Sequence, residues 1–378
     1  MVQDKRNIKV NTKKLVIIGA SIGQLPLVAR AKEMGLHTIC IAWDRGAVCK
    51  EICDEFYPIS IFEVDDIVEK CRDLKVDGVV TTASEETALV CSKVSTALGL
   101  NGVSPETLEM IQDKSTLREL TTGIIGLSKP KVWSINEKNN ISYPCVVKPT
   151  KGSAKKGVSY CASADELDSA ISYAKDASRE DIIIEEYITG DEYSVESLSF
   201  HGKHQIIQIT KKITTGYPHF VELEHHQPAV LSPDIKENVG KVIEDILVVV
   251  GYENGAAHIE IKINSNGIYL IEVNPRGGGD RISDTLVGLS TDFDYLGAMI
   301  EVGLDQYSYR PSHNTNYSGI LFLSAQSERL MKYFDDSPYE WLVERKITDL
   351  SEKRLTEATG NYDRNGYIIY QSTTPIEL

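Results

Sequence analysis

The sequence predicts an α/β protein in which a small parallel sheet precedes a larger, strand-rich domain. Within the first hundred residues, short apolar runs alternate with segments of helical periodicity, which is typical of a doubly wound parallel sheet. After residue 100 the texture changes to strands joined by glycine turns. Of the 378 residues, 42% are hydrophobic, which is enough apolar material for two or three cores.

Composition narrows the class of partner. The formal net charge of −15 repels nucleic-acid phosphate and anionic lipid, so we expect small-molecule partners, no nucleic acid and no membrane. The seven cysteines are odd in number and scattered, which indicates free thiols in a reducing compartment. No apolar run approaches the roughly 20 residues that span a bilayer, and the N-terminal segment lacks the apolar core of a signal peptide. We therefore expect a cytoplasmic protein.

The first domain, residues 1–100, is predicted from alternating elements. Strands are expected at 14–20, 37–42 and 77–82, and helices at 24–34, 65–74 and 85–98. The turn at 19–23 contains two glycines, and Asp44 falls roughly where a ribose-binding acid would lie. The spacing is not the three-glycine dinucleotide fingerprint, so a scaffold turn is favoured. An NAD-dependent dehydrogenase is an alternative that rests on this sheet alone.

The second part begins with two helices. Ser104 followed by Pro105 is a good helix start, because serine caps the free N–H groups and proline suits the first helical position. A helix is expected from there to residue 109 and another at 112–122. Strands dominate from residue 143, with helices near 165–175 and 235–251, and residues from 306 carry no recognisable chemistry.

The most informative segment is a β-hairpin over residues 257–279. A three-residue loop at 265–267 would place Glu260 opposite Glu272. Because side chains alternate along a strand, one face would carry His258, Glu260, Lys262, Glu272 and Asn274. The other face would enter a core with Ile259, Ile261, Ile263, Ile271 and Val273.

Two carboxylates directly across a strand pair repel one another, and a divalent cation between them relieves that repulsion. Glu260, Glu272 and the Asn274 amide offer the hard oxygen ligands that Mg²⁺ or Mn²⁺ prefers. The alternative is a solvated hairpin face on which Lys262 partly neutralises the acids.

A phosphate-binding segment is predicted upstream. Lys148 ends an apolar strand at 145–149, and a lysine in that position is seldom without a partner. The connector at 151–157 is rich in Gly, Ser and Lys and would offer N–H groups and cations to a polyphosphate. Its candidates are Gly152, Ser153 and Lys156, although Lys155 and Lys156 could equally be solvated turn lysines.

A second nucleotide-binding segment follows at 181–190, where an apolar strand runs into a glycine turn. Backbone groups passing such a segment can contact the edge of adenine. Glu192, seven residues after Glu185, could accept hydrogen bonds from both ribose hydroxyls.

The order of these elements resembles the ATP-grasp superfamily over roughly residues 100–305. The resemblance comprises a helix lysine (Lys114), the strand lysine (Lys148) and a glycine loop at 152–157. It continues with a hinge of the form E-E-Y-I-x-G-x-E at 185–192 and closes with E…E-x-N-P-R, formed by Glu260, Glu272, Asn274 and Arg276. The first domain resembles the pre-ATP-grasp domain of that superfamily. Residues 101–305 would form a two-lobed ATP-grasp domain with a mobile lobe at about 125–190, and residues 306–378 a C-terminal lobe or lid.

The resemblance implies a role for each candidate. Lys114 and Lys148 would hold ATP phosphates, and Glu192 would bind the ribose. The adenine would be framed by Glu185, Glu186, Tyr187 and Ile188. One or two Mg²⁺ ions would be bound by Glu260, Glu272 and Asn274. Catalysis would rely on Lys148 and Arg276, which stabilise charge on the transferring oxygens.

Residues 210–230 resemble the bacterial L-amino-acid ligases within the superfamily. Glu222 is of a suitable type to hold an amino group, and His226 to contact a substrate or phosphate, unless it is simply a satisfied histidine. Gly278, in the run after Arg276, would let a substrate carboxylate approach backbone N–H groups.

We therefore expect an ATP-dependent ligase that activates a carboxylate as an acyl phosphate and couples it to an amine, releasing ADP and phosphate. Many such proteins pair through their scaffolds, so a homodimer is an expectation. One alternative is a carboxylase or carbamoyl-phosphate-synthase-like enzyme on the same fold. Another is a nucleotide-binding regulatory protein that has lost catalysis.

Overall fold

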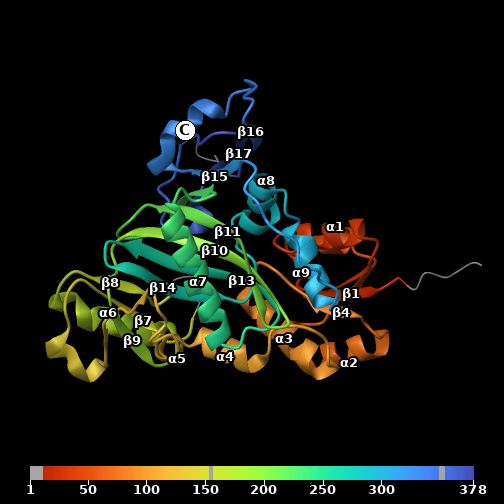
Figure 1. The fold of residues 1–378 in the computed structure, drawn as a ribbon, viewed down its shortest axis with the longest axis horizontal. Helices are drawn as coiled ribbons and strands as arrows, with labels where there is room; N and C mark the ends of the chain where they lie inside the picture. Colours follow the sequence, from red (N-terminus) through yellow and green to blue (C-terminus); the bar gives the residue numbers. More distant parts are fainter. Residues whose placement is uncertain (1–11, 153–155, 349–353) are drawn as a thin grey trace, which may run out of the picture. The chain divides into compact units, whose positions relative to one another are not determined.

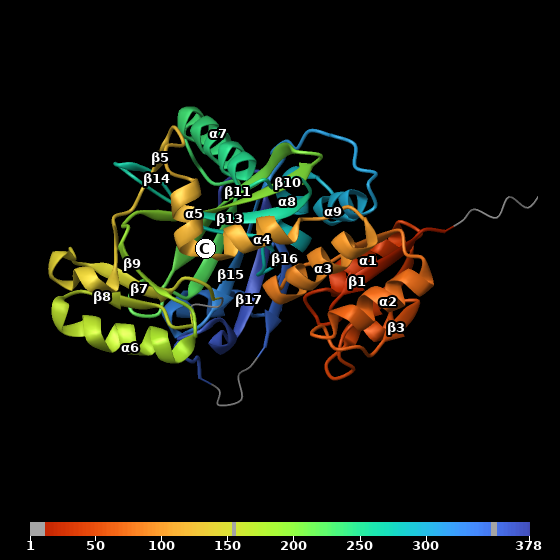
Figure 2. The same ribbon diagram turned by 90° about the horizontal axis from the view of Figure 1, so that it is seen from below.

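The computed structural model describes residues 12–152, 156–348 and 354–378, which form two compact units. The first unit comprises the chain up to Gly102 together with Leu296–Tyr307. The second comprises Val103–Tyr295 and Ser308–Leu378 (Figures 1 and 2). Residues 296–305, which the sequence analysis placed in the second domain, and residues 306–307, which it placed in the C-terminal segment, therefore pack with the first unit.

The first unit is built on a four-stranded parallel sheet with the strand order β3-β2-β1-β4. The predicted parallel sheet is thus confirmed. Its strands are β1 (Lys14–Ile18), β2 (His37–Ile41), β3 (Glu55–Tyr57) and β4 (Gly78–Val80). Its helices are α1 (Leu25–Glu33), α2 (Val64–Leu74), α3 (Glu85–Leu98) and most of α9 (Tyr295–Gly303). Sequence analysis missed β3, because three half-buried residues are too few to show an alternating pattern.

Close backbone approach explains why the end of α9 belongs to this unit. A Cβ atom added to Gly78 in β4 would lie 2.7 Å from the Gly303 carbonyl oxygen. One added to Gly303 would lie 2.3 Å from a Val80 methyl carbon. Asn101 also donates its side-chain N–H to the Val302 carbonyl at 2.7 Å. Glycine at both contact points lets the helix end rest directly on the strand.

The second unit contains a nine-stranded sheet in the order β16-β17-β15-β12-β11-β10-β13-β14-β5. Neighbouring strands are antiparallel except for β14 and β5. The central strands are β10 (Asp191–Phe200), β11 (Lys203–Thr214), β12 (Glu222–Gln227), β13 (Gly255–Asn264) and β14 (Gly267–Asn274). The outer strands are β5 (Leu127–Ser128), β15 (Tyr317–Leu323), β16 (Leu342–Ile347) and β17 (Gly366–Ser372). The C-terminal segment from residue 308 therefore supplies three strands to the same sheet.

A smaller antiparallel sheet in this unit has the order β6-β9-β7-β8. Its strands are β6 (Val132–Trp133), β7 (Cys145–Pro149), β8 (Ser159–Cys161) and β9 (Ile182–Glu186). Helix α6 (Leu167–Ala177) covers it, and Val147, Ile171 and Ile184 lie in their shared core. The remaining helices are α4 (Pro105–Gln112), α5 (Lys114–Leu120), α7 (Pro233–Val249) and α8 (Val287–Thr291).

In the β13–β14 hairpin, Glu260 pairs with Glu272 as predicted, although the length of the loop and the register beside it differ from the prediction. The loop has two residues rather than three, because Asn264 pairs with Gly267. A β-bulge then leaves Ile271 without an opposite residue on β13, and this restores the register. Ile271 is consequently half-buried, and the core positions on β14 fall to Ile268, Leu270 and Val273.

The central strands carry apolar side chains on one face and buried polar side chains on the other. Along β11, Ile207 and Ile209 alternate with Gln208, Thr210 and Lys212, and all are buried. We call the second side the polar face. Helix α8 covers part of it, because Gln208 donates its side-chain N–H to the Ser290 hydroxyl at 2.8 Å. A face that is buried yet polar is an expected location for a site.

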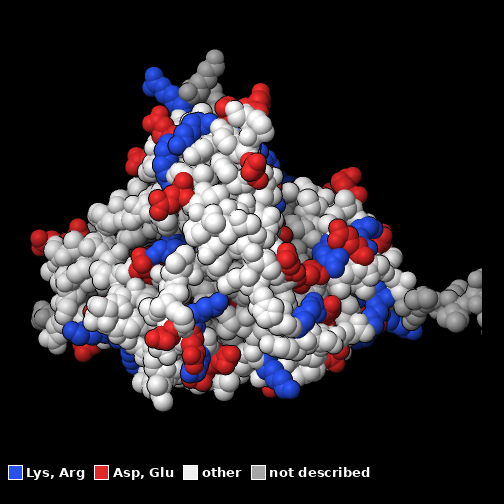
Figure 3. Space-filling model, turned by 45° about the horizontal axis from the view of Figure 1, so that its top comes forward, with Lys and Arg blue, Asp and Glu red and all other residues white. Residues whose placement is uncertain are grey.

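On the side drawn in Figure 3, acidic and basic side chains are interspersed, without a continuous basic area. All seven cysteines are free thiols. Among the described residues, no helix has both the length and the apolar character needed to cross a membrane.

The turn before β10 generates a stability prediction. Gly190 has a φ of +132°, and a Cβ atom there would lie 2.5 Å from the Ile263 carbonyl oxygen. We expect Gly190→Ala to lower the free energy of unfolding by about 2 kcal/mol, measured by urea denaturation. Gly240→Ala is the control, because a Cβ atom there meets nothing within 4 Å and lies in α7. It should instead stabilise the protein by about 0.5–1 kcal/mol. Equal effects of the two substitutions would contradict the strained turn.

Candidate active site

Lys148 lies in a buried ion-pair network on the small sheet. It is the penultimate residue of β7, and its Nζ atom contacts Glu185 Oε2 on the neighbouring strand β9. Arg118, from α5, donates Nε–H to the other oxygen of Glu185 at 2.8 Å. All three side chains are almost fully buried. The predicted partner for the strand lysine is therefore Glu185, whose side chain is engaged here and so is not free to contact adenine.

Charge and burial compete in this network. Burial would raise the pKa of Glu185, but Lys148 and Arg118 outweigh it and hold that pKa at about 2. For Lys148, burial lowers the pKa, and it outweighs the opposite effect of Glu185. Arg118 and Lys114 add to that lowering, so two further cations lie near Lys148 beside the one carboxylate of Glu185. A cluster with excess positive charge is suited to bind polyphosphate.

Arg118 also connects this network to the hairpin. It donates a second N–H to the Ile271 carbonyl at 3.0 Å. Ile271 is the bulged residue of β14, so its carbonyl lies beside Glu272. The contacts from Lys148 through Glu185 and Arg118 thus reach the backbone next to a predicted metal ligand.

The glycine loop lies close to the helix lysine. Lys114 begins α5, its backbone N–H donates to the Thr150 carbonyl at 2.9 Å, and its Nζ donates to the Gly152 carbonyl at 3.3 Å. Lys156 is exposed at the far end of the loop. Ser153 lies outside the described residues. The structure therefore brings Lys114 to the loop that follows Lys148.

The predicted adenosine segment is organised by a lysine that sequence analysis did not assign to it. Lys262, on β13, contacts Glu192 Oε1 at 3.0 Å and donates to the Ile188 carbonyl at 3.1 Å. Its Nζ atom also lies 4.9 Å from the centre of the Tyr187 ring. Glu186 is held separately, because its carboxylate accepts the Lys131 backbone N–H at 3.2 Å. The predicted ribose acid and the hinge are therefore joined through one cation.

Four aromatic rings gather beside this segment. Tyr160 on β8 lies 4.8 Å from Tyr187 and 4.9 Å from Tyr217, measured between ring centres. Phe220, from the same loop as Tyr217, lies 6.0 Å from Tyr187. Such rings can provide an apolar wall for a planar base. Nothing in the spacing of these residues along the chain indicated the cluster.

The predicted metal ligands lie at neighbouring positions on β13 and β14. Glu260 and Glu272 are opposite one another, and Asn274 donates its amide N–H to Glu272 Oε1 at 2.9 Å. Because the amide nitrogen of Asn274 faces Glu272, its amide oxygen points away from that carboxylate. Two carboxylates and an amide oxygen match the donor preference of Mg²⁺. The described residues contain no metal-binding group of three or more His, Cys, Asp or Glu side chains.

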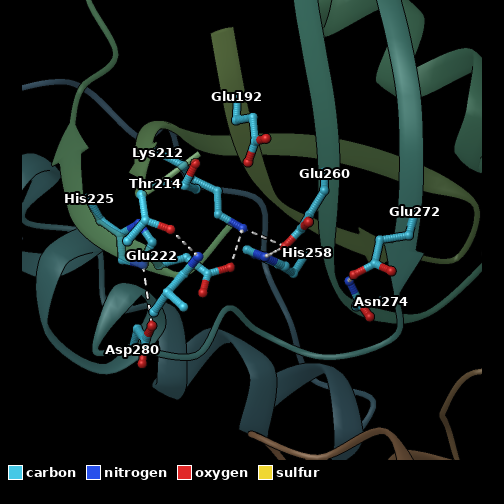
Figure 4. Close-up of polar contacts among 12 residues, drawn as sticks. Glu192, Lys212, Thr214, Glu222, His225, His258, Glu260, Glu272, Asn274 and Asp280 are labelled. Carbon is cyan, nitrogen blue, oxygen red and sulfur yellow. Dashed lines mark hydrogen bonds and ion pairs between the residues drawn. The ribbon is translucent and has the colours of Figure 1, made fainter. Parts of the chain in front are cut away.

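A further cation lies on the polar face beside Glu260 (Figure 4). Lys212 Nζ is 2.6 Å from Glu260 Oε1 and 3.7 Å from Glu222 Oε1. Burial would lower the pKa of Lys212, but the two carboxylates outweigh it and raise that pKa above its usual value. A β-bulge in β12 turns Glu222 to this face, because Thr214 pairs with Glu222 while Ile213 pairs with Glu224.

Glu196 and His258 also lie on the polar face, next to Glu260. His258 Nδ1 lies 2.5 Å from Glu196 Oε1, and its Nε2 lies 3.3 Å from Glu260 Oε1. Burial would lower the pKa of His258, but Glu196 and Glu260 raise it to about 9. The Gly278 N–H donates to Glu196 Oε2 at 2.9 Å. The carboxylate that approaches the Gly278 N–H is therefore that of Glu196, not that of a substrate. This corrects the reason for which Gly278 was assigned to the substrate.

The two adjacent histidines of β12 have different environments. His226 lies 2.7 Å from Glu224 and 2.8 Å from the Tyr370 hydroxyl, so both its ring nitrogens are engaged away from the polar face. His225 is buried opposite Lys212. Its Nε2 lies 3.5 Å from Asp280, and its buried Nδ1 has no hydrogen-bond partner among the described residues. His225, rather than His226, is the histidine that faces the candidate site.

Two further residues, one of them predicted, lie in the segment that follows β14. Arg276 is half-buried just after β14 and donates to the Gly277 carbonyl at 3.0 Å. Asp280, which sequence analysis did not assign, accepts two hydrogen bonds from Arg364 at 2.8 and 2.9 Å. Arg364 belongs to the C-terminal segment, so that segment helps to build the polar face.

A family model for the ATP-grasp domain matches residues 141–284. This stretch of the chain is therefore similar to the ATP-grasp domain. It is 26% identical, over 268 residues, to an uncharacterised protein of Sinorhizobium fredii, covering 68% of this chain and 55% of that protein. It is also 26% identical over 294 residues to the carbamoyl phosphate synthase large chain of Clostridium beijerinckii, covering 70% of this chain. The matches span only 55% and 27% of these two relatives' lengths.

Solved structures share the fold over nearly the whole chain. The L-amino acid ligase of Bacillus licheniformis superposes with a TM-score of 0.78 at 21% identity, covering 96% of this chain and 94% of that one. The biotin carboxylase domain of Hydrogenobacter thermophilus 2-oxoglutarate carboxylase, solved with MgADP and bicarbonate, has a TM-score of 0.73 at 17% identity. That alignment covers 96% of this chain and 86% of the other. ATP-grasp proteins form a family of ATP-dependent ligases that use ATP with Mg²⁺.

The buried Glu185 network predicts a pH-dependent stability difference. Removing one member of a buried ion pair leaves an uncompensated charge, so Glu185→Gln should cost about 3 kcal/mol of unfolding free energy at pH 7. Because the pKa of Glu185 is depressed to about 2, its contribution is present above about pH 4.5 and fades as pH falls towards 2. The gap between wild type and Glu185→Gln should therefore narrow by about 1 kcal/mol between pH 6 and pH 3.5.

Urea unfolding at the two pH values measures this gap. Glu186→Gln is the matched control, because Glu186 is the next residue on β9 and is half-exposed. Its effect should be small and independent of pH. A gap for Glu185→Gln that widens on acidification would show that the carboxylate is not held ionised by Lys148 and Arg118.

Proposed function

We propose that this protein is an ATP-dependent carboxylate–amine ligase that uses ATP and Mg²⁺ and acts on amino-acid substrates. It activates a carboxylate as an acyl phosphate, an amine then displaces the phosphate, and an amide, ADP and phosphate are released. The proposal rests on the arrangement of the second unit's polar side chains. The superfamily supplies only the ATP-dependent ligase class, and the choice of amino acids follows the features of β12 and the polar face.

One observation carries the proposal, namely the chain of contacts from Lys148 through Glu185 and Arg118 to the Ile271 carbonyl. It holds a lysine of the cation-rich cluster in a fixed relation to the strand that bears Glu272. For in-line transfer, a γ-phosphate must contact both a cationic side chain and the metal ion that the carboxylates would hold. Because the network is buried, both groups are positioned before the nucleotide binds, as electrostatic catalysis requires.

In the proposed reaction, Lys148 and Lys114 bind the phosphate oxygens of ATP. Glu192 accepts the ribose hydroxyls, and its carboxylate is oriented for this by Lys262. The hinge backbone at Ile188 and the rings of Tyr160, Tyr187 and Phe220 enclose the adenine. Glu260, Glu272 and Asn274 would hold Mg²⁺, which supplies charge neutralisation to the phosphates when bound. Arg276, beside these ligands, balances charge on the transferring group.

The amino-acid end is assigned to the part of the polar face around β12. Glu222 lies there beside Lys212, and a carboxylate is the suitable partner for a substrate ammonium. The His225 Nδ1 atom is buried on the same face with no protein partner among the described residues, so it is assigned to a polar substrate atom. His226 is left out of the substrate site because both its ring nitrogens are engaged elsewhere.

Product analysis tests the proposal directly. The full chain is incubated with Mg-ATP and pools of L-amino acids, and ADP, AMP and phosphate are quantified, with bicarbonate tested separately. We expect ADP and phosphate only when amino acids are present. ADP with bicarbonate alone would move the assignment to the carboxylase or carbamoyl-phosphate class. AMP with pyrophosphate would exclude an acyl-phosphate mechanism.

A single substitution tests the metal ligands. Glu272→Gln keeps the shape of the side chain but removes its charge, so ADP formation should fall by at least about a hundredfold. Its thermal unfolding should remain close to that of wild type, because Glu272 is only half-buried. Glu244→Gln, on the exposed side of α7, is the control and should retain full turnover. Undiminished ADP production by Glu272→Gln would remove the metal assignment.

A further inference from the structure

Lys212 occupies a position that no part of the proposed reaction has yet used. Its ammonium group lies between two carboxylates, 2.6 Å from Glu260 and 3.7 Å from Glu222. The Lys212 side chain is only 6% exposed. Figure 4 shows the lysine reaching across the polar face, with Glu222 on one side and Glu260 on the other. A buried lysine held this closely is the local counter-ion of both acids.

That arrangement conflicts with the role assigned to Glu260. The oxygen that contacts Lys212, Oε1, also lies 3.3 Å from His258. A divalent cation bound through Oε1 of Glu260 would need the same electron pairs, and one bound through either oxygen would repel an ammonium group at this distance. The metal and the lysine therefore cannot both hold Glu260 as the lysine holds it in this structure.

We propose that Lys212 is an internal counter-ion that a divalent cation displaces from Glu260. The released ammonium group then contacts Glu222 and the carboxylate being activated. The second step rests on the proposed function as a whole, whereas the displacement rests on the contacts of Lys212 and on the assignment of Glu260 as a metal ligand. No covalent change is involved, and the lysine keeps its proton throughout.

The side chain is suited to such an exchange. An ammonium group is a compact point charge on a flexible four-carbon stem, so it can change partners without the fixed geometry of a guanidinium. Glu222 already lies 3.7 Å away, and it is attached to a different strand from Glu260. Loss of one partner thus leaves the lysine with a second carboxylate, and the burial of its charge stays compensated.

The exchange would place a positive charge where negative charge develops. The carboxylate under activation must approach the γ-phosphate, and the two anions repel each other. A lysine that becomes available only after the metal has bound would favour that approach in the loaded enzyme. In the metal-free protein the same lysine prevents Glu222 and Glu260 from repelling one another.

Lys211 provides a matched control within the same strand. Because side chains alternate, it faces away from Lys212, where its Nζ lies 2.6 Å from Asp191 and 4.8 Å from the centre of the Tyr193 ring. It has the same chemistry and the same place in β11 but no contact with either acid of the polar face.

The test is a titration of the full-length protein with Mn²⁺ alone, in which free Mn²⁺ is followed by electron paramagnetic resonance. Removing the competing ammonium should tighten binding, so Lys212→Met should lower the Mn²⁺ Kd by about tenfold. Lys212→Gln should do the same, and Lys212→Arg, which keeps the charge, should not. Lys211→Met should bind Mn²⁺ as wild type does. Thermal melts identify any variant that fails to fold, and Lys212→Gln then replaces Lys212→Met.

Turnover tests the second step on the same variants. ADP formation with the amino-acid substrate should fall by about a hundredfold or more in Lys212→Met, and Lys211→Met should remain active. A Mn²⁺ affinity in Lys212→Met that is unchanged or weaker would overturn the displacement, since a merely structural lysine would not compete with the metal. Tighter Mn²⁺ binding with full turnover would overturn the contact with the reacting carboxylate. If wild type turns over no substrate, the proposed function fails while the Mn²⁺ titration still decides the displacement.

Discussion

Charged side chains buried on one face of a β-sheet constrain much of the second unit. Glu196, Lys212 and His258 are all more than 90% buried on strands whose opposite face is packed with apolar side chains. Such charges are tolerated only when each has a partner at hydrogen-bond distance. The backbone has to supply those partners, and it does so with β-bulges. The bulge at Ile271 sets Glu272 against Glu260, and the bulge in β12 turns Glu222 towards Lys212.

Two clusters of opposite character result from this arrangement. Around Glu185 the cations are in excess, because Lys148 and Arg118 contact that one carboxylate and Lys114 adds its charge beside Lys148. Around Lys212 the carboxylates are in excess. The first cluster is suited to phosphate and the second to a divalent cation and a substrate amine. Arg118 connects the first cluster to the strand that bears Glu272, since it donates one N–H to Glu185 and another to the Ile271 carbonyl. A phosphoryl transfer site needs both kinds of charge at a fixed separation.

The fold and part of the site could be predicted from the sequence because their signals are periodic or adjacent in the chain. Alternation along H-I-E-I-K-I assigned Glu260 and Lys262 to one face, and the strand–glycine–strand order placed Lys148 before a loop. The partners of these residues gave no such signal. Arg118 lies 67 residues from Glu185, and the Glu196–His258 pair spans 62 residues. Only the sheet order brings them together. The choice between His225 and His226 depended on a bulge, which shifts the alternation by one residue and leaves no mark in the composition.

The same reasoning explains why, under the proposed function, the polar face would need a lysine as well as a metal. Before any ligand binds, Glu222 and Glu260 lie close together in a largely dry environment, and like charges there oppose folding. A metal bound only with the nucleotide could not relieve that cost in the free protein. Lys212 on β11, one of the two strands between β12 and β13, relieves that cost until a divalent cation displaces it from Glu260. In the proposed scheme, Glu260 therefore needs a lysine partner in the free protein and a metal ion in the loaded one. Lys212 can meet both needs in turn, because it has a second carboxylate partner in Glu222.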